Sequence, residues 1–201
     1  GMTRRAWLKA VGSGAAVLAG SGCSLLGDGP VQAPPPKPDL KAKAVKNLML
    51  GIMSGVYAGF PVEEAARKIK EDGFSNVVLE GRFADVGFDA AKPDWDAVKK
   101  MTTALDKQGI RVSGLFGYYN VINPVPEHRQ RGEQRMECLI KNWKRFGCPI
   151  VSTETGTFNT QSEFDSHPDN YTERGYAACR DAFARLAKMA EKNGAIVAIE
   201  V

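Results

Sequence analysis

The sequence lacks the signals of a zinc-binding or disulfide-rich protein. It contains two histidines and four cysteines in 201 residues. Cys138, Cys148 and Cys179 do not form the close pairs that zinc sites use. We interpret them as small buried residues, because an oxidising compartment would permit a disulfide bridge between them but would not require one.

The body of the chain also lacks a surplus of basic residues. The formal net charge is +4 at pH 7, and Arg4, Arg5 and Lys9 near the start account for three of those charges. Clustered Lys and Arg side chains are needed to bind a phosphate backbone, so the nearly neutral remainder argues against a nucleic-acid partner. The hydrophobic fraction of 43% and the charged fraction of 25% are typical of a soluble globular domain.

The segment 1–27 contains an apolar run that is too short, and too rich in glycine and serine, to span a bilayer. The twin-arginine string Thr3–Lys9 precedes this run, and together they resemble a twin-arginine export signal. Cys23 follows small residues and resembles a lipoprotein processing site. Residues 28–45 are rich in proline and predict an extended tether. We therefore expect export by the twin-arginine machinery to the periplasm, with Cys23 as the candidate lipidation site and membrane anchor.

From residue 46 onward the chain repeats one unit, which is an amphipathic helix, a glycine and a short apolar run. The glycines of the four junctions are Gly73, Gly109, Gly147 and Gly194. Each stands where a helix would end in a left-handed residue, a conformation that glycine adopts without a Cβ clash. The junctions predict helices that are each followed by a strand.

Apolar patterns predict four helices and five strands within residues 46–201. The helical stripes are Val62, Ala65, Ala66 and Ile69; Trp95, Val98, Met101 and Leu105; Met136, Leu139, Ile140 and Trp143; and Cys179, Phe183, Leu186, Ala187 and Ala190. The expected strands are Asn47–Met53, Asn76–Gly81, Arg111–Gly117, Ile150–Glu154 and Ala195–Val201. Near-continuous apolar runs that alternate with helices indicate parallel strands covered on both faces.

This alternation fits either an open doubly wound sheet or the first part of a (β/α)8 barrel. A nucleotide-binding sheet would carry a glycine-rich phosphate loop after its first strand. The segment Met53–Phe60 has neither the dinucleotide-binding spacing nor the P-loop spacing. We therefore predict an α/β fold that is an incomplete (β/α)8 TIM barrel.

Barrel enzymes carry their reactive side chains at the carboxyl ends of the strands. That rule selects one glutamate or a short group of residues at each of four strand ends, namely Glu80; Tyr118, Tyr119 and Asn120; Thr153, Glu154 and Thr155; and Glu200. In the last strand, Glu200 lies on the face opposite Val197 and Ile199, so it points into the barrel mouth if the more apolar face meets the helices. His167, which precedes a proline in a loop, is a further candidate substrate contact.

Three segments carry a family resemblance. They are residues 70–80 (KEDGFSNVVLE), residues 151–157 (VSTETGT) with 167–170 (HPDN) downstream, and residues 195–200 (AIVAIE). In this order and spacing they resemble the xylose isomerase-like TIM barrels of the sugar phosphate isomerase/epimerase group. The resemblance implies a sugar or sugar derivative as substrate and a divalent metal ion (Mn, Mg, Co or Zn). Glu80, Tyr118, Tyr119, Glu154 and His167, selected by their positions, are the candidate substrate contacts. It also implies that Glu200 is a metal ligand and a catalytic carboxylate that exchanges a proton through a metal-stabilised enediolate.

In that family an Asp, a His and a second Glu from the next three strands complete the metal site. No counterparts to these three ligands precede Val201. Residues 46–201 are also fewer than the roughly 250 residues of a typical full barrel. The expectation is therefore the N-terminal part of a barrel, which by itself binds metal poorly and has no isomerase activity.

Other functions stay open on the same residues. A lyase or dehydratase acting on a keto-sugar or an inosose could use this barrel, because removal of an acidified proton can lead to β-elimination. A non-catalytic, lipid-anchored carbohydrate-binding protein would keep the barrel without a metal site. The endonuclease branch of the family is the weakest alternative. The resemblance would require a multi-zinc site with histidines after the second and third strands, where this sequence has Glu80 and Tyr118.

Overall fold

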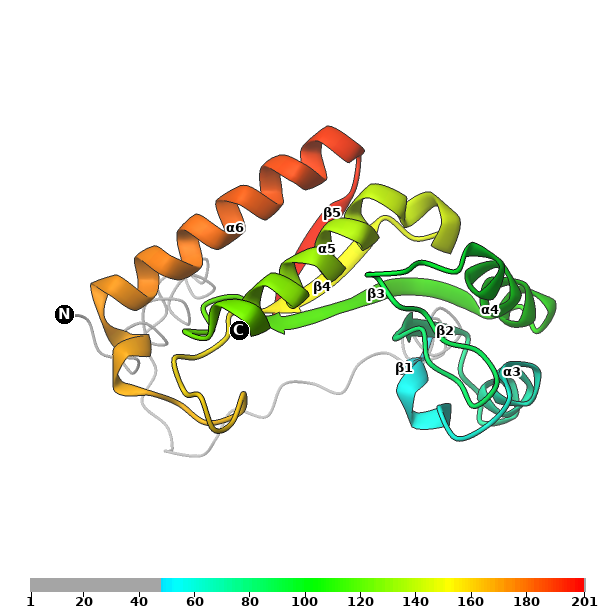
Figure 1. The fold of residues 1–201 in the computed structure, drawn as a ribbon. Coiled ribbons are helices and arrows are strands. Elements are labelled where there is room, and N and C mark those ends of the chain that lie inside the picture. The colour runs from blue at the N-terminus through cyan, green and yellow to red at the C-terminus, as the bar shows by residue number, and fades with distance from the viewer. Residues whose placement is uncertain (1–47, 201) are drawn as a thin grey trace, which may run out of the picture. The chain divides into compact units, whose positions relative to one another are not determined.

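The computed structural model describes residues 48–200, which form a five-stranded parallel sheet in the order β1-β2-β3-β4-β5 with helices between the strands (Figure 1). The strands are β1 (Gly51–Met53), β2 (Asn76–Leu79), β3 (Arg111–Asn120), β4 (Ile150–Glu154) and β5 (Ile196–Glu200). The helices are α3 (Val62–Glu71), α4 (Trp95–Lys107), α5 (Pro126–Phe146) and α6 (Glu173–Asn193), with 3-10 turns η2 (Ser54–Tyr57) and η3 (Pro168–Tyr171). The predicted alternation and the incomplete barrel are confirmed. The predicted signal, tether and Cys23 lie outside the described residues.

The junction glycines end the helices as predicted. All four have a positive φ, and Gly147, with φ +75°, is the left-handed cap of α5. Its N–H donates to the carbonyl of Trp143, which satisfies one of the carbonyls left open at the helix end. Strand β4 begins three residues later, at Ile150. The glycine therefore ends α5 and lets the chain turn towards the next strand.

The helical stripes are buried against the sheet, with one correction in α6. Val62, Ala65, Ala66 and Ile69 of α3 are fully buried, as are Met136 and Ile140 of α5. In α6 the buried face is centred on Ala182, Leu186 and Ala190, whereas Ala187 is exposed. The predicted stripe was therefore wrong at Ala187, because at 100° per residue Ala187 lies past the edge of the arc that is centred on these three residues.

Strand bounds differ from the prediction at both ends of the strands. The first strand begins at Gly51 and not at Asn47, and the last begins at Ile196 and not at Ala195. Strand β2 ends at Leu79, so Glu80 opens the following loop, and β3 continues past Gly117 to Asn120. The longer β3 pairs with β4 at its far end, where Asn120 lies opposite Glu154. This extension brings Tyr118, Tyr119 and Asn120 into the sheet, where an expected loop would have left their directions open.

The helices pack on one face of the sheet, and the other face is partly open. Val77, Leu79 and Val151 are buried in the core beneath the helices, whereas the alternating residues Val78 and Ser152 are partly exposed. The expectation of strands covered on both faces is therefore wrong for residues 48–200. In a closed barrel the inward side chains of all the strands cover one another, and five strands do not close a barrel.

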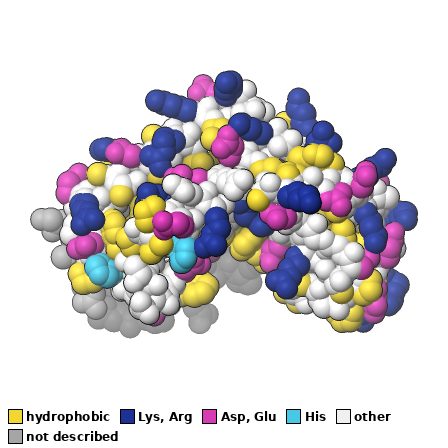
Figure 2. Space-filling view, in the orientation of Figure 1, with side chains coloured by type: hydrophobic (Ala, Val, Ile, Leu, Met, Phe, Trp, Pro, Cys, Tyr) yellow, Lys and Arg dark blue, Asp and Glu magenta, His cyan; other side chains and the backbone are white. Residues whose placement is uncertain are grey.

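Basic and acidic side chains are interspersed over the face drawn in Figure 2. Lys107 of α4 pairs with Glu63 of α3 at 3.1 Å, and Arg185 of α6 pairs with Glu133 of α5 at 3.2 Å. Exposed ion pairs each contribute about 0–1 kcal/mol, so the buried apolar faces hold the helices together. Within the described part of the chain, no helix has the length and the apolar character needed to cross a membrane.

Candidate functional site

Three glutamates and a tyrosine lie at the carboxyl end of the sheet. Glu80 directly follows β2, Tyr118 lies near the end of β3, and Glu154 and Glu200 are the last residues of β4 and β5. Glu154 and Glu200 pair in register between adjacent parallel strands, so their side chains lie on the same face. This end of a barrel sheet is where substrates bind and react.

Tyr118 links β3 to β5 across the end of β4. Its hydroxyl donates a hydrogen bond to Glu200 Oε2 at 2.6 Å. That hydrogen bond, together with burial and the negative charges of Glu200 and Glu154, raises the pKa of Tyr118 to about 12. The phenol therefore stays protonated and remains a donor that orients Glu200 throughout the ordinary pH range.

Glu154 lies in a cleft of about 410 Å³ whose lining also includes Glu163, Phe164 and Glu200. Burial raises the pKa of Glu154 above its ordinary value, and the charges of Glu163 and Glu200 raise it further. A carboxylate that is partly desolvated beside other carboxylates is a stronger proton acceptor than an exposed one. The cleft therefore holds a basic group next to the orientated Glu200.

Glu154→Gln is expected to raise the stability of the fold at neutral pH. The folded-state pKa of Glu154 is raised, so the stability linked to its protonation is present below the unfolded pKa of about 4.3 and is lost as the pH rises through the folded value. Gln resembles the protonated form. Urea unfolding should show the variant more stable than the wild type at pH 7, with the difference shrinking towards pH 4.

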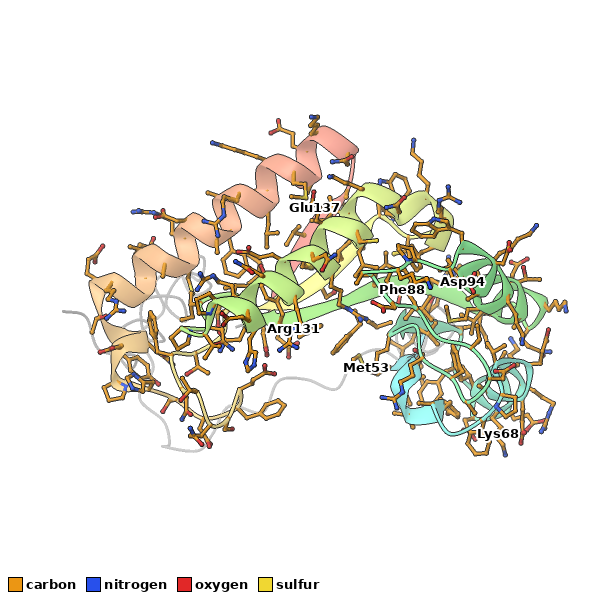
Figure 3. All side chains as sticks on the ribbon, viewed as in Figure 1. Met53, Lys68, Phe88, Asp94, Arg131 and Glu137 are labelled. Carbon is orange, nitrogen blue, oxygen red and sulfur yellow. The ribbon has the colours of Figure 1, made fainter. Side chains whose placement is uncertain are left out.

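The control is Glu137→Gln on α5 (Figure 3). Glu137 forms an exposed ion pair with Lys141 one turn away, so its loss should lower stability by no more than about 0.5 kcal/mol. An equal gain in both variants at pH 7 would show that the crowding of carboxylates at Glu154 is not the cause.

Glu80 is held by the first turn after β1. The Gly55 N–H donates to Glu80 Oε1 at 3.1 Å, and the Glu80 N–H donates to Ser54 Oγ at 2.9 Å. A Cβ at position 55 would lie 2.2 Å from Glu80 Oε1, so only glycine permits this approach without displacing the carboxylate. Sequence reasoning missed Ser54 and Gly55, although a Ser-Gly pair directly after an apolar strand was visible.

Arg135 of α5 is a further residue that sequence reasoning missed. Its Nε donates to the Phe116 carbonyl at 3.0 Å and its Nη2 donates to the Glu80 carbonyl at 3.0 Å. Burial lowers the pKa of Arg135, and the charges of Glu80 and Asp89 oppose that shift. The guanidinium thus ties the end of β2 to β3. Its only sequence signal was its place directly before the apolar stripe of α5.

Two aromatic rings line a second cleft, which Arg135 also lines. The rings of Phe116 and Tyr118 stack with centroids 4.6 Å apart and planes 22° apart. Together with Glu80 and Arg135 they line a cleft of about 490 Å³. Phe88, in the loop that leads to Asp94 at the start of α4 (Figure 3), also lines it. Tyr118 lines this cleft, and its hydroxyl contacts Glu200, which lines the other.

Asn120 fixes the loop that follows β4. Its Nδ2 donates to the Thr157 carbonyl at 2.6 Å, while its Oδ1 accepts from the Thr157 N–H at 3.0 Å and from the Ile122 N–H at 3.2 Å. Gly156, with φ +78°, approaches so closely that a Cβ there would lie 2.2 Å from Asn120 Oδ1. The buried amide thus positions the loop that carries Glu163 and Phe164.

Two of the candidate substrate contacts lie away from these clefts. Tyr119 is buried on the opposite face of β3, against Gly132 of α5, and burial raises its pKa to about 12. His167 caps η3, where its Nδ1 accepts from the Asp169 N–H at 3.2 Å. The structure therefore brings together Glu80, Tyr118, Glu154 and Glu200, and it does not bring Tyr119 or His167 to them.

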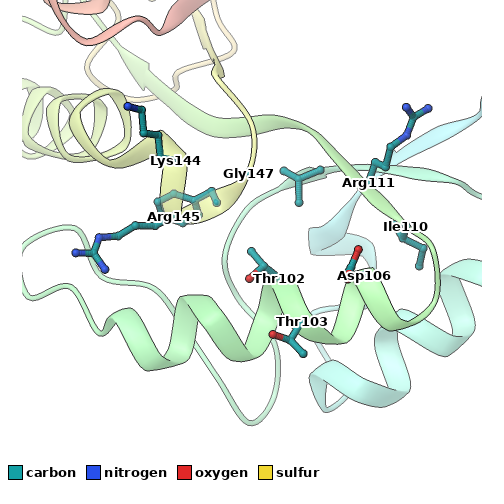
Figure 4. A pocket seen from close by; sticks show the side chains of 10 residues that line it. Thr102, Thr103, Asp106, Ile110, Arg111, Lys144, Arg145 and Gly147 are labelled. Carbon is teal, nitrogen blue, oxygen red and sulfur yellow. The ribbon is translucent and has the colours of Figure 1, made fainter.

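A further hollow of about 430 Å³ lies at the other end of the sheet (Figure 4). Asp106 of α4, Arg111 at the start of β3 and Lys144 near the end of α5 line it. Arg145 also lines it, and its guanidinium carbon lies 4.5 Å from the ring centroid of Trp95. This end of a barrel serves stability, and we assign no site to it.

The geometry agrees with a comparison to known families. The family model described as Xylose isomerase-like TIM barrel matches residues 64–201, which is more than half of the chain. The chain belongs to this family. The sugar isomerase/epimerase resemblance seen in the sequence is thereby confirmed at the level of the family. No curated protein matches the chain.

Solved structures share this xylose isomerase-like fold. The 3-keto-D-glucoside 4-epimerase from E. coli has a TM-score of 0.50 and 20% identity, covering 70% of this chain and 51% of that one. A xylose isomerase-like TIM barrel protein from Mycobacterium smegmatis, in complex with magnesium, has a TM-score of 0.55 and 17% identity, covering 76% and 54%. A D-allulose 3-epimerase from Methylomonas sp., in complex with D-allulose, has a TM-score of 0.52 and 16% identity, covering 77% and 51%. The chain spans about half the length of these structures, and at these identities the likeness shows the shared fold.

The described part of this xylose isomerase-like barrel does not by itself form a metal centre. Among residues 48–200, no group of three His, Cys, Asp or Glu side chains could hold a metal ion. Glu154 and Glu200 supply carboxylate oxygens side by side, which suit hard divalent cations, but one of them already accepts the hydroxyl of Tyr118. The donor set of these residues is therefore incomplete for such an ion.

Proposed function

We propose that the chain belongs to a sugar isomerase or epimerase in which Glu200 acts on the substrate. The observation that carries this proposal is the in-register pair Glu154 and Glu200 at the ends of β4 and β5, with the hydroxyl of Tyr118 held on Glu200 at 2.6 Å. Relatives of the same fold include a 3-keto-D-glucoside 4-epimerase and a D-allulose 3-epimerase that was solved with D-allulose.

The chemistry requires a base beside a carbon-bound proton that a neighbouring carbonyl makes acidic. Glu200, orientated by Tyr118, takes that proton and is one of the two carboxylates between which it is exchanged. Glu154 lies next to it and contacts the hydroxyl groups of the substrate, and its raised pKa reflects a desolvated setting. Return of the proton to the opposite face of the carbon gives the epimer, and its return to the adjacent carbon gives the aldose or ketose isomer.

A divalent metal ion, Mn, Mg, Co or Zn, forms part of this proposal with Glu200 as one of its ligands. Bound next to a carbonyl, such an ion would polarise the carbonyl oxygen as a Lewis acid. The magnesium complex of the relative from Mycobacterium smegmatis supports this. Residues 48–200 provide no complete ligand set.

The test uses the whole protein to which this chain is proposed to belong, in D₂O, with D-fructose and D-allulose as probes and Mn²⁺ present. Nuclear magnetic resonance should show deuterium entering the carbon next to the carbonyl, together with epimer or isomer. Glu200→Gln is expected to lower the exchange rate by at least about 100-fold, which is typical for loss of a general base. Addition of a chelator is expected to stop turnover.

The matched control is Glu191→Gln at an exposed position of α6, which should leave the rate unchanged. Exchange that persists in Glu200→Gln would contradict the role of Glu200. Absence of exchange with every ketose would contradict the isomerase proposal, whereas exchange accompanied by loss of water from the substrate would indicate a lyase.

A further inference from the structure

Tyr118 lies in an irregular stretch of β3. The pairing of β3 with β2 stops at Leu115. On the other side, β3 advances by four residues between Phe116 and Asn120, whereas β4 advances by two residues between their partners. We call residues 117–119 the β3 bulge, because extra residues on one strand of a pair redirect side chains as a β-bulge does. Regular pairing with the neighbouring strands therefore does not set the direction of Tyr118.

Arg135 contacts the residue at which the β3 bulge begins. Its Nε donates to the Phe116 carbonyl at 3.0 Å, and its Nη2 donates to the Glu80 carbonyl at 3.0 Å. The guanidinium carbon also lies 6.0 Å from the centroid of the Phe116 ring, about the outer limit of a cation–π contact. Within residues 48–200 no carboxylate forms an ion pair with this guanidinium. Arg135 therefore holds both the backbone and the ring of Phe116.

The Phe116 ring in turn supports Tyr118. The two ring centroids lie 4.6 Å apart and the ring planes differ by 22°, so Tyr118 cannot swing to another rotamer without losing this stack. At its far end, the Tyr118 hydroxyl donates to Glu200 Oε2 at 2.6 Å. A hydrogen bond depends on angle as well as distance. A change in the direction of the Tyr118 ring would therefore weaken its bond to Glu200.

We propose that Arg135 is a positioning residue for Glu200 and that it acts through Phe116 and Tyr118. With the guanidinium in place, the phenol points at Glu200 before a substrate arrives and holds the carboxylate in one orientation. Without it, the β3 bulge can direct Tyr118 elsewhere. This inference rests on the proposed function, because it takes Glu200 as the base.

The test replaces Arg135 with lysine in the whole protein to which this chain is proposed to belong. Arg135→Lys keeps the charge, but one ammonium group does not replace the planar fork that spans two carbonyls. In D₂O with D-fructose and Mn²⁺, the variant should lower kcat for proton exchange by about tenfold and leave KM within about twofold, because misplacement of a base affects the reacting geometry more than binding. Tyr118→Phe should have a similar effect on kcat. Combining the two substitutions should lower kcat by no more than about twofold beyond Tyr118→Phe alone.

A second measurement does not depend on turnover. In protein labelled with ¹³C at the tyrosine Cζ atoms, the nuclear magnetic resonance signal of Tyr118 is identified by its absence from Tyr118→Phe, and its chemical shift reports the hydrogen bond to Glu200. Arg135→Lys should move this signal towards that of Tyr171, which is 80% exposed. Phe116→Leu removes the stack and keeps an apolar side chain, so it should reproduce both results. Circular dichroism checks that each variant is folded.

Arg145→Lys is the matched control on the same helix. The Arg145 guanidinium carbon also lies over an aromatic ring, 4.5 Å from the centroid of Trp95, but at the other end of the sheet. This variant should change neither kcat nor the Tyr118 signal.

Two outcomes would overturn the positioning role of Arg135. They are a Tyr118 signal that stays in place in both Arg135→Lys and Phe116→Leu, and a full tenfold loss of kcat when Arg135→Lys is added to Tyr118→Phe. Either outcome would leave the effect of Glu200→Gln on proton exchange unchanged. If no ketose exchanges its proton, the proposed function fails, and the Tyr118 signal alone decides whether Arg135 directs the phenol.

Discussion

Asn120→Ala is expected to lower the free energy of unfolding by about 3 kcal/mol, because it leaves buried backbone groups without partners. The amide side chain makes three hydrogen bonds, two to Thr157 and one to Ile122, and is only 2% exposed. Alanine can replace none of them, and the Thr157 carbonyl and N–H would be left in a region that excludes water. Urea unfolding followed by circular dichroism measures the loss.

A matched substitution in the same loop is Asn159→Ala. Asn159 is partly exposed, and its Oδ1 accepts from the N–H groups of Gln161 and Ser162, which water can solvate when the side chain is removed. The expected loss is about 1 kcal/mol. If both substitutions cost the same, the burial of Asn120 does not set the value of its hydrogen bonds.

Gly132→Ala is expected to destabilise the protein by about 2 kcal/mol, although the change normally favours a helix by about 1 kcal/mol. Gly132 is buried in α5, and a Cβ there would lie 2.1 Å from Tyr119 Cδ2 and 2.3 Å from Tyr119 Cγ. The clash involves the root of the ring, so α5 or β3 must shift, and overpacking of this kind costs about 1–3 kcal/mol. Thermal unfolding measures the change.

The control for this clash is Gly59→Ala in the turn after η2. No atom lies within 4 Å of a Cβ built at Gly59, and its φ is not positive. The change should therefore stay within about 0.5 kcal/mol. If Gly132→Ala stabilised the protein, the Tyr119 side chain would have to adopt another position, and the packing described between α5 and β3 would be wrong.

The repeating unit of this fold could be predicted from local chemistry. A glycine after a charged helical turn marks a left-handed cap whatever the tertiary context, and Gly73, Gly109, Gly147 and Gly194 all proved to have a positive φ. The stripe of α6 was less secure because alanine fits both sides of a helix. Ala182 is buried and Ala187 is exposed because of the segments that pack against α6. The sequence of α6 does not identify those segments.

Only the site residues at the ends of strands could be predicted from the sequence. Period-two alternation requires Tyr118 and Tyr119 to face opposite ways, but both are aromatic, and the space left by Gly132 of α5 determines which of them is buried. Arg135 could not be found, since its partners are backbone carbonyls that come near only after β2, β3 and α5 have assembled. The rest of the site depends on contacts between segments that are distant in the sequence, which no local pattern predicts.

The anchoring of the β4–α6 loop by Asn120 bears on how a substrate enters. The Thr157 amide bonds to a side chain of β3, so its hydrogen should exchange with solvent only when that end of the sheet opens. The base of the loop therefore cannot swing as an independent lid. The side chain of Phe164, which lines the cleft and is 93% exposed, can still change rotamer within nanoseconds.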